Sequence, residues 1–477
     1  MAQIQLAAHL TLQVTRKTEW ARDLLIEPVL ALEESAPDKP GKMPGDLLLI
    51  SSEANRLLVS LGLAEKLNAG SIRKAGKAAA RWLTDHRAVR IGIHANTLDK
   101  FGIENALEAF CEGLLLGAFN FDKHKTKDNK SIPVAVHVLT EGDHAQLQER
   151  LFHTATVVGG VNLAREWSHE PPNIINPVTL GERAKALASA SGLKCTVLGE
   201  KELTEMGAGA IISVGLGSKT PSQMIILEHS GNGTQANTPP VVVVGKAITF
   251  DTGGYSLKNT TNIVGMKFDK CGGMTVIGVM QAVAELGLPV PVVGIIAAAE
   301  NMISNEAYRP NDIITSLSGK TIEIISTDAE GRMVLADALT YASTQYKPRA
   351  IIDLATLTGG VRVALGGVRA GLMSNDDNLA DELFDAGERT HERLWRMPLD
   401  EEYFELIKGT DSDIKNSAGV PSASPIVGGT FLKQFVPDEI PWAHIDIAGT
   451  ATVEKTKGIR SATGFGVRLV LEFLSGI

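Results

Sequence analysis

Residues 241–258 read VVVVGKAITFDTGGYSLK, and this stretch decides the fold of the 477-residue chain. Its four consecutive valines predict a strand over 241–246 that is buried on both faces, because a strand with one wet face alternates apolar and polar residues. A second apolar run, PVVGIIAAA at 291–299, predicts another such strand. Stretches with helical periodicity lie between and beyond them, for example at 273–286 and 331–346. The alternation predicts an α/β fold with a central, mostly parallel sheet sandwiched by helices.

The chain is predicted to contain two α/β domains. Residues 1–150 carry no net charge, whereas the formal charge of −9 falls on the remainder. Strand signals at 4–14, 47–51, 89–94 and 132–139 alternate with helix signals at 70–83 and 104–119, which predicts a small N-terminal α/β domain. Further strands are expected at 194–198, 223–228, 321–325, 350–354 and 443–447, and further helices at 143–167, 379–392 and 462–475. Prolines after 167 favour a boundary there, so we predict domains at 1–150 and 181–477 joined by a linker helix and proline-rich turn at 151–180.

Composition excludes several classes of protein. The chain is 44% hydrophobic and 21% charged, as globular proteins are, and its pI near 5.7 argues against a general binder of nucleic acid or anionic membranes. Three widely spaced cysteines predict neither a thiolate zinc site nor a disulfide framework, and favour a cytoplasmic setting. The N-terminus lacks the basic region of a signal peptide. The sequence contains no run of 18 apolar residues, so no membrane-spanning helix is expected.

Three segments place carboxylates beside glycines: 241–258, MKFDKCGG at 266–273 and STDAEGR at 326–332. The first and third follow predicted strands, where open α/β sheets bind ligands, and we expect Lys246, Asp251 and Lys258 in a glycine-rich loop. Four converging carboxylates (Asp251, Asp269, Asp328 and Glu330) would be costly unless neutralised. Lys246, Lys258 and Arg332 would offset part of the charge, and divalent cations could offset the rest. Two such ions about 3.5–4 Å apart make a hydrolytic site.

Each of these residues also has a purely structural interpretation. Asp328 and Glu330 could be acids at a helix start, Asp251 a turn former, Asp269 a helix N-cap and Lys246 a solvated charge. The residues alone leave the joint metal site and these separate roles open.

The ordered segments resemble the leucine aminopeptidase (cytosol aminopeptidase) family of two-metal exopeptidases. STDAEGR is similar to that family's NTDAEGR signature, and GKAITFDTGGYSLK resembles its GKGxTFDSGGxSxK segment. Segments 162–177, 266–273, 300–312, 353–360 and 442–451 match in order and spacing. The resemblance covers roughly 155–477 and is much weaker over 1–150, so it implies that 181–477 is a catalytic metallopeptidase domain. The N-terminal domain would then serve assembly or shield the site.

The resemblance implies a role for each site residue. One divalent ion would be held by Lys246, Asp251, Asp269 and Glu330, and a more exchangeable one by Asp251, Asp328 and Glu330. The two ions of each subunit would be Zn²⁺ or Mn²⁺, and a water that they activate would be the nucleophile. Lys258 would polarise the scissile carbonyl, and Arg332 would hold a bicarbonate ion that acts as general base.

The resemblance also implies the substrate and the assembly. Met266, Thr356, Gly359, Ala448 and Ala451 would form a pocket for a Leu-like or Met-like first side chain, and the Leu357 carbonyl would contact the substrate. The substrates would be small peptides, and the protein would assemble as a homohexamer. Ser326 and Asn259 depart from the family pattern, and Lys270 is expected to add a positive charge beside Asp269.

Two other functions are weighed against this one. An additional DNA-binding or regulatory role is suggested by the basic run at 66–90, although the overall charge argues against nucleic acid. A different two-metal hydrolase, such as a phosphatase, would use similar carboxylates. The ordered match of segments to the aminopeptidase family does not support this alternative.

Overall fold

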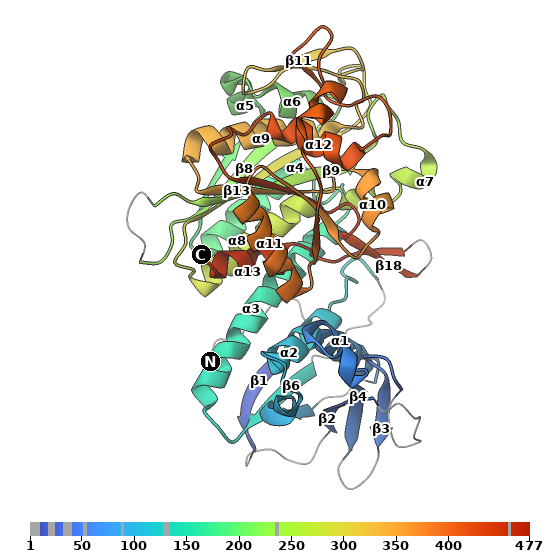
Figure 1. Ribbon diagram of the computed structural model, residues 1–477, viewed down its shortest axis with the longest axis vertical. Coiled ribbons are helices and arrows are strands. Elements are labelled where there is room, and N and C mark those ends of the chain that lie inside the picture. Colours follow the sequence, from blue (N-terminus) through green and yellow to red (C-terminus); the bar gives the residue numbers. More distant parts are fainter. Residues whose placement is uncertain are drawn as a thin grey trace. The chain divides into compact units, whose positions relative to one another are not determined.

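The computed structural model describes residues 10–17, 24–31, 41–50, 55–86, 90–126, 134–233, 238–456 and 459–477 (Figure 1). Parts of the strands predicted at 4–14, 47–51, 89–94 and 132–139 lie outside these ranges. The chain divides into two compact units, Met1–Asn162 and Leu163–Ile477. The division falls inside helix α3 (His144–His169) rather than at residue 150. The predicted linker at 151–180 comprises most of α3, a proline turn and the start of α4 (Pro177–Ser191).

The first unit contains a six-stranded sheet in which only one neighbouring pair is antiparallel. Its order is β1 (Leu10–Arg16), β6 (Val134–Thr140), β5 (Arg90–His94), β2 (Leu24–Val29), β4 (Arg56–Ser60) and β3 (Leu47–Ile50), with β3 and β4 antiparallel. Helices α1 (Ala69–Asp85) and α2 (Ala106–Gly117) pack at backbone distance. A Cβ on Gly76 would lie 2.2 Å from the Phe110 carbonyl oxygen, so this contact requires glycine.

The second unit is built on an eight-stranded mixed sheet. Its order is β15 (Leu394–Arg396), β14 (Ala370–Ser374), β17 (Trp442–Asp446), β13 (Ala350–Ala355), β9 (Val241–Asp251), β10 (Val292–Asn301), β8 (Gln223–His229) and β7 (Lys194–Leu198). The four central strands, β17, β13, β9 and β10, are parallel, whereas β14, β8 and β7 add antiparallel pairings. The predicted α/β class with a mostly parallel central sheet is therefore confirmed.

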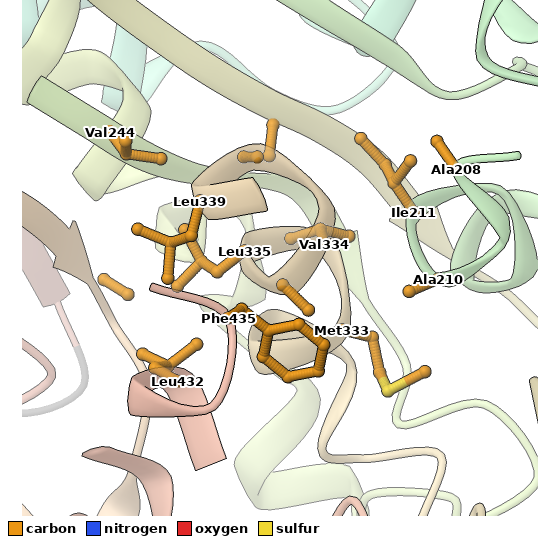
Figure 2. Close-up of a cluster of buried hydrophobic side chains, with 14 of the residues drawn as sticks. Ala208, Ala210, Ile211, Val244, Met333, Val334, Leu335, Leu339, Leu432 and Phe435 are labelled. Atoms are coloured by element: carbon orange, nitrogen blue, oxygen red, sulfur yellow. The ribbon is translucent and has the colours of Figure 1, made fainter. Parts of the chain in front are cut away.

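Helices cover both faces of this sheet (Figure 1). On one face α8 (Cys271–Leu286) packs on β9, β10 and β13, and it contacts α4 and α13 (Val467–Ser475). On the other face lie α6 (Gly209–Gly215), α9 (Glu330–Tyr346) and α12 (Ser424–Lys433). Figure 2 shows the apolar cluster on this second face, where Leu335 and Leu339 of α9 meet Val244 of β9 and Phe435 just after α12. This packing fixes the start of α9 against the sheet.

Glycines bring α8 into direct backbone contact with the sheet. A Cβ on Gly245 of β9 would lie 2.6 Å from the Gly273 Cα, and one on Gly272 would lie 2.1 Å from the Leu354 carbonyl oxygen. Any side chain at these positions would push the helix away. The residues just before α8 are therefore held close to the middle of β9.

Several predicted elements differ in position. Strand β9 continues to Asp251, so Lys246 and Asp251 lie in the strand and not in a loop as expected. Strand β12 (Thr321–Glu323) joins β11 (Ile313–Thr315) and β16 (Ile414–Lys415) in a separate sheet instead of the central one. The helix predicted at 462–475 begins at Val467, because Ala462 ends the hairpin of β18 (Thr452–Thr456) and β19 (Ile459–Ala462).

Short helices complete the second unit: α5 (Glu200–Met206), α7 (Thr260–Ile263), α10 (Gly359–Leu365) and α11 (Asp377–Thr390). Within the described part of the chain, no helix combines the length and apolar character needed to cross a bilayer.

Candidate active site

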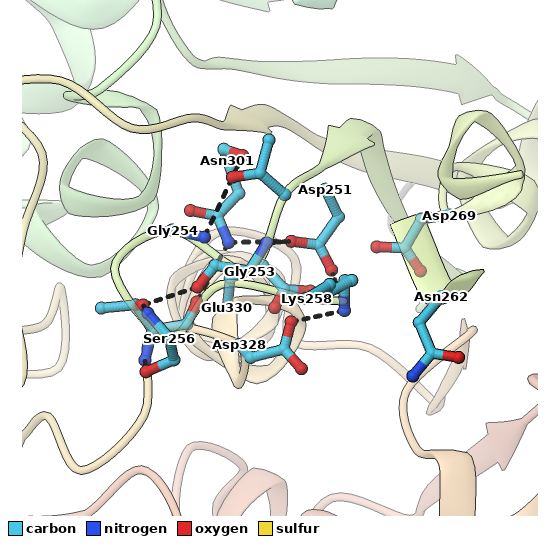
Figure 3. A network of polar contacts seen from close by, with 12 residues as sticks. Asp251, Gly253, Gly254, Ser256, Lys258, Asn262, Asp269, Asn301, Asp328 and Glu330 are labelled. Atoms are coloured by element: carbon cyan, nitrogen blue, oxygen red, sulfur yellow. Dashed lines mark hydrogen bonds and ion pairs between the residues drawn. The ribbon is translucent and has the colours of Figure 1, made fainter. Parts of the chain in front are cut away.

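The carboxyl ends of the central parallel strands surround one cavity of about 570 Å³. All five predicted metal ligands and Lys258 line it. Asp251 ends β9, Lys258 lies in the loop that follows, and Asp269 precedes α8. Asp328 lies in the turn before α9, and Glu330 is the first residue of that helix (Figure 3). The structure thus brings together residues from three separate segments of the sequence.

Lys246 bridges two of the carboxylates from the middle of β9. Its Nζ lies 2.9 Å from Asp269 Oδ2 and 2.9 Å from Glu330 Oε1, and it donates to the Thr356 carbonyl oxygen at 2.9 Å. Burial alone would lower the pKa of Lys246, but the surrounding carboxylates outweigh burial and hold this pKa above its ordinary value. Lys246 is therefore an ammonium in the metal-free protein, and it must lose a proton to donate its lone pair to a metal.

Lys258 bridges the other two carboxylates. Its Nζ lies 2.8 Å from Asp251 Oδ2 and also contacts Asp328 Oδ1 (Figure 3). Burial and the nearby carboxylates raise the pKa of Asp328 to about 6, and burial raises the pKa of Asp269 to about 7. Four carboxylates face two ammonium groups, so the site keeps an excess of negative charge when all of these groups are ionised.

The donor set fits a divalent cation. Asp251, Asp328 and Glu330 each offer a carboxylate oxygen, and these oxygens lie within 4.8 Å of one another. Glu330 Oε2 is buried and has no hydrogen-bond partner among the described residues. A buried carboxylate oxygen without a donor is costly, and carboxylate oxygens suit hard or borderline cations.

A second group of polar residues positions the ligands, and sequence reasoning missed it. Asn301 Nδ2 donates to Asp251 Oδ1 at 2.9 Å and to the Thr327 carbonyl oxygen at 3.0 Å. Thr327 Oγ1 donates to the Gly253 carbonyl oxygen at 2.6 Å, and Tyr308 donates to the Thr327 carbonyl oxygen at 2.9 Å. Asn301 ends β10, next to Asp251 in the sheet, so the strand-end rule applied to β10 could have found it.

The predicted substrate-binding residues line the same cavity. They are Met266, Thr356, Leu357, Gly359, Ala448 and Ala451. Thr356 Oγ1 donates to Asp269 Oδ1 at 2.7 Å. The Asp446 carboxylate, also missed, accepts from the Leu357 backbone N–H at 3.2 Å and from Thr358 Oγ1 at 2.6 Å. These bonds fix the loop after β13 against the carboxyl end of β17.

Arg332 differs from the other predicted residues because it is not among the described residues that line the cavity. Its side chain is buried, Nη1 donates to the Asn416 carbonyl oxygen at 2.8 Å, and the guanidinium lies 5.9 Å from the Phe431 ring centre. Burial lowers the pKa of Arg332 to about 10. Its Nε is buried without an acceptor in the described structure, which leaves one donor for an anion.

Lys270 was expected to add a positive charge beside Asp269, and in the described structure its side-chain nitrogen bonds to backbone carbonyl oxygens rather than to that carboxylate. Its Nζ donates to the carbonyl oxygens of Ser168, Glu170 and Lys267 at 3.1, 3.0 and 2.5 Å. Burial lowers the pKa of Lys270 to about 7. The side chain instead ties the start of α8 to the end of α3.

Comparison with known proteins assigns the segment that carries this site to a family of peptidases. A family model described as the catalytic domain of the cytosol aminopeptidase family matches residues 162–471. The chain belongs to the cytosol aminopeptidase family. The N-terminal domain of the same family matches residues 47–128, where the sequence resemblance is weak.

Relatives within the family cover most of the chain. A probable cytosol aminopeptidase of Syntrophotalea carbinolica is 43% identical over 432 residues, which is 88% of this chain and 85% of the relative. One of Cenarchaeum symbiosum is 42% identical over 425 residues, 88% and 86% of the two chains. The bottromycin maturation enzyme BotP in complex with Mn has a similar structure, with a TM-score of 0.86, 30% identity and coverage of 96% and 99%. These homologues indicate a metallo-aminopeptidase, and they give the DNA-binding alternative no support.

Proposed function

We propose that this cytosol aminopeptidase removes the N-terminal residue from short peptides, with a leucyl-type preference, at a site for two divalent ions. The observation that carries the proposal is the convergence of four carboxylates and two lysines in one cavity, with Glu330 Oε2 buried and without a donor in the described structure. Lys246, Asp251, Asp269 and Glu330 would hold one ion, and Asp251, Asp328 and Glu330 the other. Zn²⁺ or Mn²⁺ suits these donors, and the Mn complex of BotP supports Mn²⁺.

When bound, the ions supply Lewis acidity, which lowers the pKa of a water molecule and polarises the scissile carbonyl. The protein's own part is electrostatic. Lys258 is mostly buried, and nearby carboxylates hold its pKa above its ordinary value despite burial. A fixed ammonium in this position stabilises negative charge that develops on the substrate's carbonyl oxygen. Arg332 would hold a bicarbonate ion as general base, using the Nε donor that has no acceptor among the described residues.

The pocket supports a leucyl-type preference. Met266 is soft, and Gly359, Ala448 and Ala451 are small, so this wall of the cavity leaves room for an aliphatic first side chain. The Leu357 carbonyl would accept a hydrogen bond from the peptide. Recognition of a free α-amine by an ion would restrict hydrolysis to unblocked N-termini.

We further propose a homohexamer that acts in the cytoplasm. Leu257, Val264 and Val363 are 60%, 65% and 89% exposed. Leu257 lines the cavity, and Val264 and Val363 each adjoin a residue that does; burial of these apolar residues against another subunit would remove them from water. Light scattering after size exclusion tests the assembly, and a monomeric mass would exclude it.

The decisive test of the activity uses leucyl-p-nitroanilide and its N-acetylated analogue, with Mn²⁺ in bicarbonate buffer. The proposal predicts hydrolysis of the free-amine compound only, and loss of that activity after chelation. Hydrolysis of neither compound by metal-loaded protein would refute the aminopeptidase assignment. Equal rates with and without bicarbonate would refute the role given to Arg332.

A further inference from the structure

The active-site cavity has a second charged region, away from the metal ligands. Six charged residues of the cavity belong to the metal cluster already described. Among the other described residues that line it, the charged ones are Arg362 and Arg460, and the rest are neutral. The cavity therefore combines a carboxylate-rich end with two arginines.

Both arginines border the pocket assigned to the first side chain. Arg362 lies three residues after Gly359 in α10, so the two residues share one helix face. A Cβ on Gly449, which follows Ala448, would lie 3.6 Å from the Arg362 Cα. Arg460 lies in β19, and its Nη1 would be 3.3 Å from a Cβ on Gly265, the residue before Met266.

Neither guanidinium forms an ion pair with a described residue, whereas both lysines of the cavity do. Lys246 and Lys258 each contact two carboxylates. Glu454 is the register partner of Arg460 across the β18–β19 hairpin, but it is not among the described residues lining the cavity. A guanidinium presents a planar fork of donors that matches a carboxylate.

We propose that Arg362 and Arg460 recognise a substrate carboxylate, and that it belongs to the side chain of an acidic first residue. The inference rests on the proposed aminopeptidase function and extends its substrates from leucyl-type to glutamyl-type and aspartyl-type N-termini. The small residues Gly359 and Ala448 leave room beside Arg362 for a side chain to reach it. The apolar part of the pocket then packs the methylene groups of glutamate as it would pack leucine.

The test compares substrates that differ only in charge. Glutamyl-p-nitroanilide should have a kcat/KM at least about tenfold above that of glutaminyl-p-nitroanilide, because charge-assisted hydrogen bonds exceed neutral ones by about this factor. Arg362→Met and Arg460→Met should each lower this ratio several-fold, and the double variant should bring it near one. Arg362→Lys keeps the charge and should retain most of the ratio. Because each ratio is measured within one preparation, partial unfolding of a variant does not affect it.

Arg349→Met is the matched control, since Arg349 is exposed, does not line the cavity and should leave the ratio unchanged. Leucyl-p-nitroanilide reports the proposed function separately. If leucyl substrate is cleaved but the glutamyl ratio is near one in the wild type, the arginine inference fails alone. If neither is cleaved, the proposed function fails.

A second pair of substrates identifies the source of the carboxylate. Leu-Gly and Leu-Gly-amide differ only at the C-terminus, and the proposal predicts similar kcat/KM values for both. A large preference for Leu-Gly that is lost in Arg362→Met would show that the arginines read the peptide's C-terminal carboxylate. That result would overturn the assignment to the first side chain.

Discussion

Replacing Gly331 by alanine should displace Lys246 and so weaken both metal binding and the fold. Gly331 is the second residue of α9, and a Cβ there would lie 2.7 Å from both Cε and Nζ of Lys246. Ordinary carbon contacts need about 3.5 Å, so the ammonium group must move by roughly 0.8 Å. Lys246 is only 2% exposed, and its Nζ is fixed by Asp269, Glu330 and the Thr356 carbonyl oxygen. It therefore cannot move without lengthening these contacts.

The expected magnitude follows from three terms. Overpacking of a filled interior costs about 1–3 kcal/mol, and weakening charge-assisted hydrogen bonds costs about 1.5–3 kcal/mol. Alanine in a helix recovers only about 0.5–1 kcal/mol relative to glycine. The free energy of unfolding of metal-free Gly331→Ala should thus fall by about 1.5–5.5 kcal/mol. Because Lys246 is also a proposed ligand, metal affinity should fall about 10–100-fold, as it does when ligands lose their positioning.

Chemical denaturation in the presence of a chelator measures the first effect, and titration of activity with Mn²⁺ measures the second. Gly476→Ala is the matched control, because its Cβ would meet its nearest neighbour at an ordinary 3.5 Å. If Gly331→Ala matched the wild type within about 0.5 kcal/mol, the usual effect of a surface substitution, and kept its Mn²⁺ affinity, the assigned role of this contact would be refuted.

Other perturbations separate the roles of the remaining residues. Lys258→Gln should lower kcat about 10²–10³-fold while metal content stays near that of the wild type by elemental analysis; loss of the metal instead would show a structural role. Asn301→Ala removes the donor to Asp251 and should lower Mn²⁺ affinity about 10–100-fold, with kcat largely restored at saturating metal. The pKa values of Asp269 and Asp328 are raised to about 7 and about 6, so protons compete with metal at a pH where ordinary aspartates are ionised. Affinity should therefore fall as the pH drops from 8 to 6, and calorimetry in two buffers should detect proton release on binding; a flat pH dependence would contradict this account.

The sequence predicted the elements that build the site where its signals were continuous. The valine run of β9 and the long apolar helices α8 and α9 were recognised because nearly all of their residues are buried. The family signatures supplied the ligand set, and the structure places all of it in one cavity. Their individual roles remain predictions.

Other elements gave weak or misleading local signals. Strand β2 reads LLIEPV, and Pro28 argues against a strand inside a sheet. The proline is accommodated because β5 pairs only with Leu24 and Leu25, so Pro28 has a single neighbouring strand. Strand β14 reads AGLMS and lacks the β-branched residues that mark strands.

The position of Lys246 could not be derived from local sequence at all. A charged residue after four valines reads as the end of a buried strand, because an isolated charge inside a protein is costly. The strand continues past it because Asp269 and Glu330, from distant segments, approach the ammonium group. Asn301 was missed for a related reason: its function lies in two hydrogen bonds that exist only once β9 and β10 are paired.

The contacts of Lys246 and Lys258 with the site carboxylates also bear on whether the protein folds before or after it binds metal. Since Lys246 and Lys258 already balance part of the carboxylate charge, the polypeptide can reach its native conformation before any metal arrives. A divalent ion would then bind to a site that is already folded, and protons would be released from the site as it binds. Folding would not depend on the ion. The identity of the bound ion would consequently depend on which divalent ions were present in the most recent buffer. The ion could be exchanged without unfolding the chain.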